Sequence, residues 1–563
     1  MPQISKARTN AYRRFAIPLL ILLLGSLTIL FHLGTAGLIE TSEGRYASVG
    51  RAMLDSGDWL VPVHNGLRHL TKPPVTYWAS ALGMKFFGIN EFGARFFLAP
   101  AAGLTALGCF YIGLALFNMQ TAILSAIILI CSLFFQVQFR GLTTDPFLTM
   151  FETLMVLGFI RFLQTHSTRR QKRWEIFFWA MAALAMLTKG PPGLLPLAGL
   201  IPGAFSCGYK DHLKTLFKSV IGWTVFILLG MGWYLYLALT IPGLLQYFLV
   251  DETLNRVASS QHQRPAPFYL YLLLLPAGIF PWTGFFFRSL RNARAYVENS
   301  NEIRLLLWWL FVPLAIFTLS SSKLAAYVLP LLVPIALLAG AGLVDLLSRL
   351  PDRLADFRFH LRVTGSILLL LGLTMFIFSM SGQLATPSLN FSLKFCGIVW
   401  VFIAIFLLGQ SWYTNRVLVL VLLAFTAPSL MFFSMPVIRG NEQLQPGKFM
   451  PSQWLLLKRI ANLPPDQQII NIEEMIEGWY FYTGRYPITW NVSRVTRFDE
   501  KKAQGLVLHG DEQLQQSVTP NSMLVLRQKD LARVSEILDY ELRTVATEGK
   551  WLVCLPERRF KGQ

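Results

Sequence analysis

The sequence carries little charge for its length, since only 14% of its 563 residues are Asp, Glu, Lys or Arg and 54% are hydrophobic. Soluble domains carry roughly 25% charged residues, so an ordinary soluble protein is excluded. Cysteine is scarce too: the five cysteines stand singly, which excludes a disulfide framework and a CxxC metal site. No GxxxxGK pattern of a phosphate-binding loop occurs, which argues against direct use of ATP.

Long apolar runs are what the sequence has instead. About thirteen runs recur, each long enough to cross a hydrocarbon core of about 30 Å as a helix. They lie near residues 15–33, 93–117, 120–139, 145–163, 174–188, 191–207, 219–240, 268–287, 303–319, 326–347, 363–380, 395–410 and 417–435. We therefore predict a polytopic α-helical membrane protein.

The placement of the basic residues predicts the orientation of these spans. Lysine and arginine outnumber the acidic residues by 50 to 31, and they cluster before the first run and near residues 169–173, 210–218, 288–294 and 349–362. If thirteen spans alternate, every cluster falls on one side, and the positive-inside rule makes that side cytoplasmic. We expect a cytoplasmic amino terminus and membrane lipids as neighbours. The rule accounts for the excess positive charge, so no nucleic acid partner is expected.

The apolar runs stop near Asn441, which divides the chain into two expected domains. Residues 1–440 form a transmembrane module that includes an outer loop at 34–92, and residues 441–563 read as a soluble α/β domain on the outer side. In this second part "QQIINI", "GLVLHG" and "SMLVLR" have strand patterns, and "QKDLARVSEILDY" has helical spacing.

The first outer loop contains a polar segment with helical spacing, "SEGRYASVGRAMLDSGDW". Tyr46 and Met53 can line one face of this helix, while Arg45 and Arg51 take the other. Glu43 and Arg45 stand at the exit of a span, where ionisable groups are costly unless they are paired or used. A functional site is one interpretation, and a merely interfacial plug is the other.

Further cations and a carboxylate are expected at the same membrane level. In "LTKPPVTYW", two prolines hold Lys72 at a set depth where a phosphate oxygen could meet it, although a lysine that snorkels to the interface is the alternative. Asp145 opens the fourth span, where capping of the helix is the alternative role. Lys323 and Tyr327 lie one helical turn apart in "SSSKLAAYVLP", and Arg256 lies in another outer loop. Such a set outlines a site for an anionic group carried by a lipid.

These motifs resemble the GT-C membrane glycosyltransferases, specifically the bacterial branch related to protein O-mannosyltransferases and, within it, the aminoarabinose lipid A transferases. The resemblance rests on "EGRYASVGRAMLDSGDWLVPVHNG", "KPPVTYW", the "TTD" turn, "SSSKLAAYVLP" and "GWYFYTGRYP". It implies a GT-C fold in the bacterial inner membrane with a periplasmic carboxyl-terminal domain. It also implies inverting transfer of a sugar from a polyprenyl (undecaprenyl) phosphate donor to lipid A or another envelope glycan. Protein O-glycosylation is an alternative acceptor chemistry, and transport of a lipid-linked sugar is an alternative of another class.

The resemblance also implies roles for particular residues. Glu43 and Asp145 are the catalytic candidates. Contacts to the donor phosphate are expected from the cations and one tyrosine of the outer motifs, namely Lys72, Arg45, Arg256, Lys323 and Tyr327. Other substrate contacts are expected from Tyr46, Tyr77, Glu252 and Arg485.

The sequence departs from the family pattern at two places. Ser42 stands where an aspartate usually precedes Glu43, so that Glu43, or Glu40 one turn earlier, would have to take over its role. In the aminoarabinose transferases, a glutamate and a histidine that resemble a divalent-metal site stand at the positions of Thr71 and Thr253. Threonine is a poor zinc ligand, which argues against a metal there, and a divalent metal stays open as the alternative to a protein without a cofactor. The substitutions also weaken the assignment of aminoarabinose as the sugar. The loop histidines His64, His69 and His262 are not counted as ligands.

Overall fold

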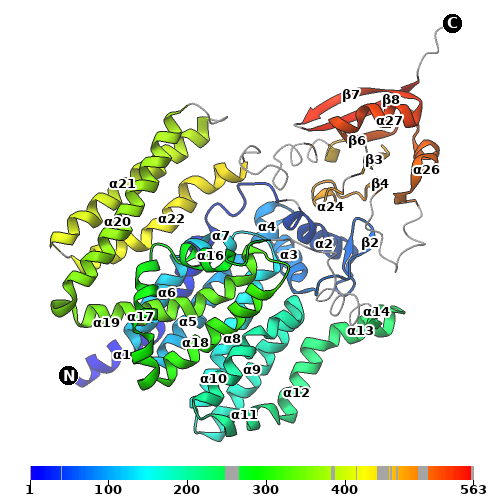
Figure 1. The fold of residues 1–563 in the computed structure, drawn as a ribbon. Helices are drawn as coiled ribbons and strands as arrows, with labels where there is room; N and C mark the ends of the chain where they lie inside the picture. Colours follow the sequence, from blue (N-terminus) through cyan, green and yellow to red (C-terminus); the bar gives the residue numbers. More distant parts are fainter. Residues whose placement is uncertain are drawn as a thin grey trace. The chain divides into compact units, whose positions relative to one another are not determined.

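The computed structural model describes residues 2–39, 41–246, 266–381, 387–413, 415–440, 456, 460–464, 467–473, 475–491, 505–548 and 550–558. The chain forms two compact units (Figure 1). The membrane unit comprises Met1–Leu33 and Phe96–Val437, and the loop–sheet unit comprises Gly34–Arg95 and Ile438–Gln563. The first outer loop therefore packs with the carboxyl-terminal part of the chain, whereas the sequence analysis grouped it with the transmembrane module.

The membrane unit is built from helices. Their bounds are α1 (Pro2–Leu30), α5 (Leu98–Leu116), α6 (Met119–Ile130), α7 (Leu133–Gln138), α8 (Thr144–Gln164), α9 (Thr168–Lys189), η1 (Pro191–Leu194), α10 (Leu195–Ser206), α11 (Lys210–Phe217), α12 (Val220–Phe226), η2 (Ile227–Met231), α13 (Gly232–Thr240), α14 (Leu244–Gln246), α16 (Leu270–Gly278), α17 (Thr283–Asn299), α18 (Asn301–Leu319), η5 (Ala325–Leu331), α19 (Leu332–Ser348), α20 (Leu350–Met380), α21 (Pro387–Tyr413) and α22 (Arg416–Gly440). Each apolar run of the sequence lies on helix.

Not every run is a single straight span. Among the described residues, eight helices are long and apolar enough to cross a membrane, and a ninth results if α16 and α17, bent by 115°, are counted together. The run at 120–139 is broken into α6 and α7, and the run at 191–207 begins with the 3₁₀ helix η1. The polytopic helical class is confirmed, while fewer spans meet these criteria than the sequence count suggested.

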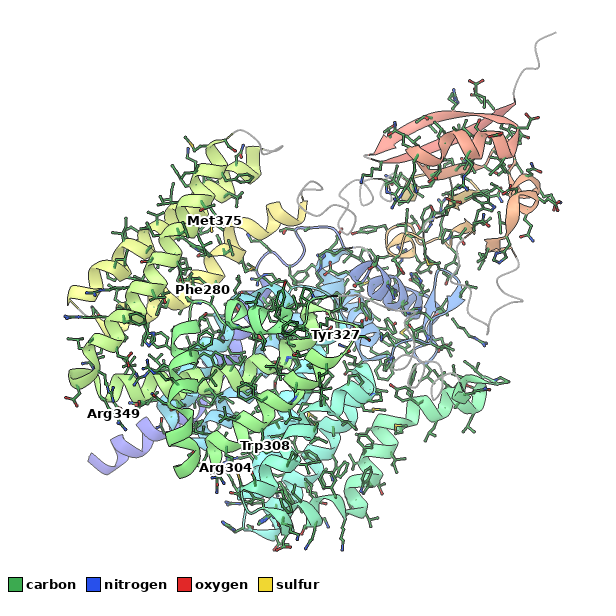
Figure 2. The ribbon with its side chains drawn as sticks, in the orientation of Figure 1. Phe280, Arg304, Trp308, Tyr327, Arg349 and Met375 are labelled. Carbon is green, nitrogen blue, oxygen red and sulfur yellow. The ribbon has the colours of Figure 1, made fainter. Side chains whose placement is uncertain are left out.

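Small residues let the helices of this unit approach closely. A Cβ added to Gly199 of α10 would stand 2.2 Å from the carbonyl oxygen of Trp308 on α18, and one added to Gly103 of α5 would stand 2.6 Å from the carbonyl oxygen of Leu22 on α1. Trp308 is labelled in Figure 2. Helices in lipid gain stability from such close backbone contact because burial from water contributes little there.

The loop–sheet unit combines helices with a six-stranded sheet. Its first part holds α2 (Glu43–Ser56), the hairpin β1 (Val63–His64) and β2 (Leu67–Arg68), α3 (Val75–Phe87) and α4 (Glu91–Arg95). Its second part holds β3 (Ile469–Ile472), α24 (Trp479–Thr483), β4 (Ile488–Trp490), β5 (Val507–Leu508), α26 (Gly510–Ser517), β6 (Met523–Arg527), η7 (Gln528–Asp530), α27 (Leu531–Leu538), β7 (Tyr540–Glu548) and β8 (Trp551–Arg558). The predicted strands and the predicted helix of this region are confirmed.

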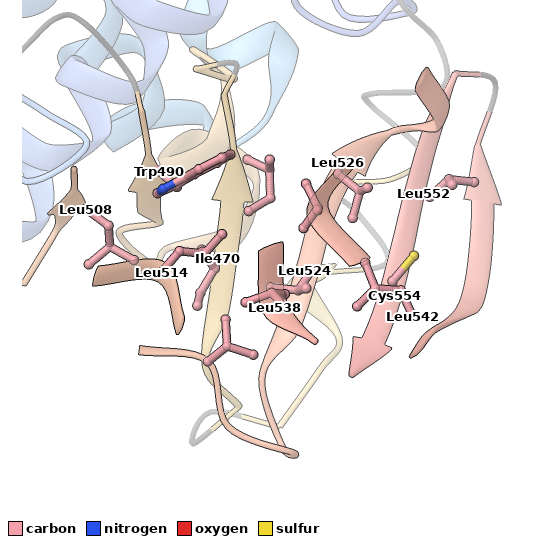
Figure 3. Packing of buried hydrophobic residues seen from close by; sticks show 13 residues of the cluster. Ile470, Trp490, Leu508, Leu514, Leu524, Leu526, Leu538, Leu542, Leu552 and Cys554 are labelled. Atoms are coloured by element: carbon pink, nitrogen blue, oxygen red, sulfur yellow. The ribbon is translucent and has the colours of Figure 1, made fainter. Parts of the chain in front are cut away.

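The sheet has the order β5-β4-β3-β6-β8-β7, and its first four strands are parallel. Alternate residues along a strand point to opposite sides of the sheet, and residues of β6 from both sides are buried in apolar clusters. Both faces of the sheet are therefore covered. Leu524 and Leu526 join one apolar cluster with Leu538 of α27 (Figure 3). Val525 between them joins a second cluster with Trp479 of α24. Helix α24 is therefore anchored in the core of the carboxyl-terminal domain.

The close approach of α10 and α18 predicts that Gly199→Ala destabilises the membrane unit. The new methyl group meets backbone rather than a flexible side chain, so we expect a cost of about 1–3 kcal/mol, observed as a lower melting temperature of the purified protein. The matched control is Gly409→Ala in α21, where a Cβ meets nothing within 4 Å and alanine favours a helix by up to about 1 kcal/mol. Equal melting temperatures for the two variants would contradict this account.

Candidate active site

Asp145 stands in the first turn of α8, and its carboxylate does not cap that helix. The N-cap residue is Thr143, in extended conformation, and no side chain bonds the first backbone N–H groups. Instead, Oδ1 of Asp145 lies 2.5 Å from Nζ of Lys189, and both side chains are largely buried. Capping as the role of Asp145 is thus wrong, and the carboxylate belongs to an ion pair.

Lys189 is the last residue of α9, and the chain turns sharply after it. Gly190 has a φ of +77°, which favours glycine, and two prolines then begin η1. Lys189 is not among the site residues predicted from the sequence. A signal was present, because "LTKGPP" around Lys189 repeats the "LTKPP" around Lys72.

Tyr327 completes this cluster from a third element. Nζ of Lys189 lies 4.4 Å from the centre of the Tyr327 ring, a distance typical of a cation–π contact. Tyr327 lies on η5 and is labelled in Figure 2. The segment before it is tied down, since the Tyr271 hydroxyl donates to the Leu324 carbonyl at 3.1 Å and Lys323 Nζ donates to the Ser320 carbonyl at 2.5 Å. Asp145, Lys189 and Tyr327 thus meet although they are distant in sequence.

A small cavity of about 20 Å³ lies beside this cluster. Its walls are mainly leucine, proline and aromatic side chains, and its polar lining residues are Lys189, Tyr327 and Glu152. Glu152 lies two turns along α8 from Asp145 and is 3% exposed. An ionisable side chain inside an apolar span is a signal of function that the sequence analysis passed over. As it stands, the cavity has room for about one water molecule.

In the loop–sheet unit, Glu43 forms a fully buried ion pair with Arg95. Nε and Nη2 of Arg95 donate to the two carboxylate oxygens at 3.0 and 2.6 Å, and the side chains are 2% and 0% exposed. The backbone N–H of Ile39 donates to the same carboxylate at 2.8 Å. Such a bidentate, enclosed carboxylate holds the chain where the first span ends. This geometry favours a positioning role for Glu43 over direct contact with substrate.

Arg45 and its neighbours form the second polar group of this unit. Nε of Arg45 donates to Oε2 of Glu477 at 3.2 Å, and His64 Nε2 lies 3.3 Å from the same oxygen. Tyr46 and Tyr77 lie with ring centres 5.4 Å apart. Tyr77 is fully buried, and burial, followed by Tyr46, raises the pKa of its hydroxyl well above the usual range. Within the described part of the chain, that hydroxyl has no hydrogen-bond partner.

The remaining candidates fall in other surroundings. Lys72 is half-buried and lies shortly before α3, beside Thr71, whose hydroxyl is 3.0 Å from His69 Nε2. Arg485 donates to the carbonyls of Pro464 and Leu463, within the carboxyl-terminal domain. Outside the described residues lie Glu40, Glu252, Thr253, Arg256 and His262. Over the ranges that the structure describes, no three His, Cys, Asp or Glu side chains come together as metal ligands.

The sequence matches the family model described as dolichyl-phosphate-mannose-protein mannosyltransferase over residues 71–236. A curated relative from Pseudomonas fluorescens strain Pf0-1, undecaprenyl phosphate-alpha-4-amino-4-deoxy-L-arabinose arabinosyl transferase 2, is 32% identical over 396 residues, which are 70% of each chain. The chain belongs to this arabinosyl transferase family. Another relative, transferase 1 of P. fluorescens strain Pf-5, is 32% identical over 65% of this chain and 66% of its own. The matches thus span about two thirds of these relatives' length.

The fold agrees with this family. A crystal structure of ArnT from Cupriavidus metallidurans, bound to undecaprenyl phosphate, superimposes with a TM-score of 0.78 at 20% identity and covers 95% of this chain and 97% of that one. An oligosaccharyltransferase of Archaeoglobus fulgidus in its apo form matches with a TM-score of 0.50 at 12% identity, over 93% and 71% of the two chains. The predicted GT-C fold, that of a multi-pass membrane protein, is confirmed.

The enclosed Glu43–Arg95 pair predicts that Glu43→Gln lowers the stability of the protein. The substitution leaves Arg95 buried with a neutral partner, which we expect to cost about 3–5 kcal/mol in chemical unfolding of the purified protein. The control is Glu557→Gln, which removes one half of an exposed pair with Arg543 and should cost at most about 1 kcal/mol. Full stability of Glu43→Gln together with lost transfer would instead assign Glu43 to the chemistry.

Proposed function

We propose that this protein transfers a sugar from undecaprenyl phosphate to lipid A or another envelope glycolipid on the periplasmic side of the inner membrane. The observation that carries the proposal is the cluster of Asp145, Lys189 and Tyr327 beside an apolar cavity. The first sugar to test is 4-amino-4-deoxy-L-arabinose, because the relatives are named as transferases of this sugar. Other sugars should be tested as well, because Thr71 and Thr253 replace the glutamate and the histidine of the aminoarabinose transferases.

The orientation is part of the same proposal. The positive-inside rule supports a cytoplasmic amino terminus, and residues 441–563 then lie in the periplasm if each of the thirteen apolar runs crosses the membrane. In this arrangement residues 1–440 carry the lipid-linked donor and most of the chemistry. The carboxyl-terminal domain, with Arg485 as a candidate, contacts the acceptor.

The reaction exchanges one bond at the anomeric carbon for another. The bond from this carbon to the phosphate oxygen breaks, an acceptor oxygen bonds to the opposite face, and undecaprenyl phosphate leaves with one more negative charge. Fixed cations lower the barrier because they stabilise the charge that develops on the leaving phosphate. We assign this task to Lys72, Arg45 and Arg256, with Lys323 and Tyr327 as further contacts.

Asp145 is assigned to the sugar and the acceptor. Its negative charge favours the oxocarbenium character of the anomeric carbon as the old bond breaks. Lys189 Nζ occupies Oδ1 of this carboxylate at 2.5 Å, so that this oxygen is not free to take a proton from an acceptor. A phosphate acceptor is already ionised and needs no strong base, whereas a protein hydroxyl does. The ion pair therefore favours a phosphorylated lipid over a protein as acceptor. The alternative of a transporter for lipid-linked sugars has no support, because the relatives of this chain are transferases.

The assignment of Asp145 and Lys189 predicts that Asp145→Asn and Lys189→Met each lower kcat by at least about 100-fold. The assay is transfer of radiolabelled aminoarabinose from undecaprenyl phosphate to lipid A by the purified protein, with folding checked by the melting temperature. Lys189→Arg, which keeps the charge, should retain part of the rate.

The matched control is Lys214→Met, which removes the cation of an exposed ion pair with Asp211 and should leave the rate unchanged. Wild-type activity of Asp145→Asn would exclude its assigned role. Failure of the wild-type protein to transfer sugar from any undecaprenyl phosphate donor would overturn the proposed function.

A further inference from the structure

The polar face of α2 is occupied by a segment from the carboxyl-terminal domain. The hydroxyl of Ser48 donates to the Glu477 carbonyl at 2.8 Å and accepts from the Phe481 N–H at 3.1 Å. Nη1 of Arg51 donates to the Phe481 carbonyl at 2.8 Å. The Tyr480 hydroxyl, on α24, donates to Asp55 at 3.0 Å. The side chains at positions 45, 48, 51 and 55 recur about once per helical turn, so one stripe of α2 faces α24.

Glu477, just before α24, brings a charge to this contact. Its side chain is 3% exposed, and its Oε2 atom is shared by Arg45 Nε at 3.2 Å and His64 Nε2 at 3.3 Å. Burial by itself lowers the pKa of Arg45, but Glu477, with Tyr46 and Tyr77, outweighs burial and raises it. The carboxylate thus orients a guanidinium group in a largely enclosed place.

The three nitrogens of Arg45 are used unequally. Nε is held by Glu477 at 3.2 Å, and Nη2 donates to the Thr41 carbonyl at 2.6 Å. Among the residues that the structure describes, Nη1 has no hydrogen-bond partner, and the side chain keeps 25% of its surface exposed. A guanidinium fixed at two nitrogens and open at the third can direct one hydrogen bond to an oxyanion.

We propose that Glu477 is a positioning residue of the transferase, through which the carboxyl-terminal domain sets the direction of Arg45 toward the phosphate of the lipid-linked donor. This inference rests on the proposed function, because it takes the oxyanion to be the donor phosphate. Glu477 does not itself touch substrate. Its effect is largest when the glycosidic bond breaks and the phosphate gains charge, since a directed donor then stabilises more charge than in the ground state.

The test compares Glu477→Ala with Arg45→Ala and with the double variant in the full-length protein. We expect Glu477→Ala to lower kcat by about 10- to 100-fold. The KM for the donor and the dissociation constant for undecaprenyl phosphate alone should each change by less than about threefold. The kcat of the double variant should be less than about twofold below that of Arg45→Ala alone, because both changes remove the same directed contact. Glu477→Asp should recover part of the rate.

The matched control is Asp55→Asn, which changes the acceptor of Tyr480 and the partner of Arg51 in the same contact but does not touch Arg45. It should keep the wild-type kcat. Independent, multiplying effects of the Arg45 and Glu477 substitutions would overturn the inference, and so would an equal loss of kcat in Asp55→Asn. Either result with an active wild-type protein leaves the proposed function standing, whereas an inactive wild-type protein overturns the function and this inference with it.

Discussion

Ionisable side chains that leave water remain charged only where an opposite charge or several hydrogen bonds meet them, and this constraint organises both units. In the membrane unit, Asp145 at the start of α8 meets Lys189 at the end of α9. In the loop–sheet unit, Glu43 at the start of α2 meets Arg95 at the end of α4. Each pair joins two helix ends and so fixes the chain where helices begin and end.

The pairs differ in how much of each charge remains accessible, and this difference separates structural from chemical roles. The side chains of Glu43 and Arg95 are sealed, with at most 2% exposed. Those of Asp145 and Lys189 keep 9% and 13%, and Lys189 lines a cavity. A group that must meet a substrate has to keep some of its surface open, at the cost of weaker electrostatic interactions. Accessibility therefore ranks Asp145 above Glu43 as a carboxylate that a substrate could reach.

Local patterns in the sequence predicted the apolar spans, the helix beginning at Glu43 and the strands that became β3, β5 and β6, because hydrophobic periodicity acts over neighbouring residues. The partners of the charged residues could not be predicted in this way. Asp145 and Lys189 are 44 positions apart, and Arg45 and Glu477 are 432 apart, so their pairing depends on how whole helices and domains pack. The sequence did show that Glu43 and Arg45 needed partners, and it left those partners unnamed.

The long-range contact between Arg45 and Glu477 also bears on why a membrane transferase carries a soluble domain. A long polar loop between spans loses much conformational entropy when it is ordered, so hydrogen bonds are needed to hold it in one conformation. Helix α24, held in the core of the sheet domain by Trp479, supplies those bonds along one stripe of α2. The domain thus orders the loop that presents Arg45. The carboxylate of Glu477 also fixes the guanidinium of Arg45, so the domain orients a charged side chain of the loop as well as its backbone.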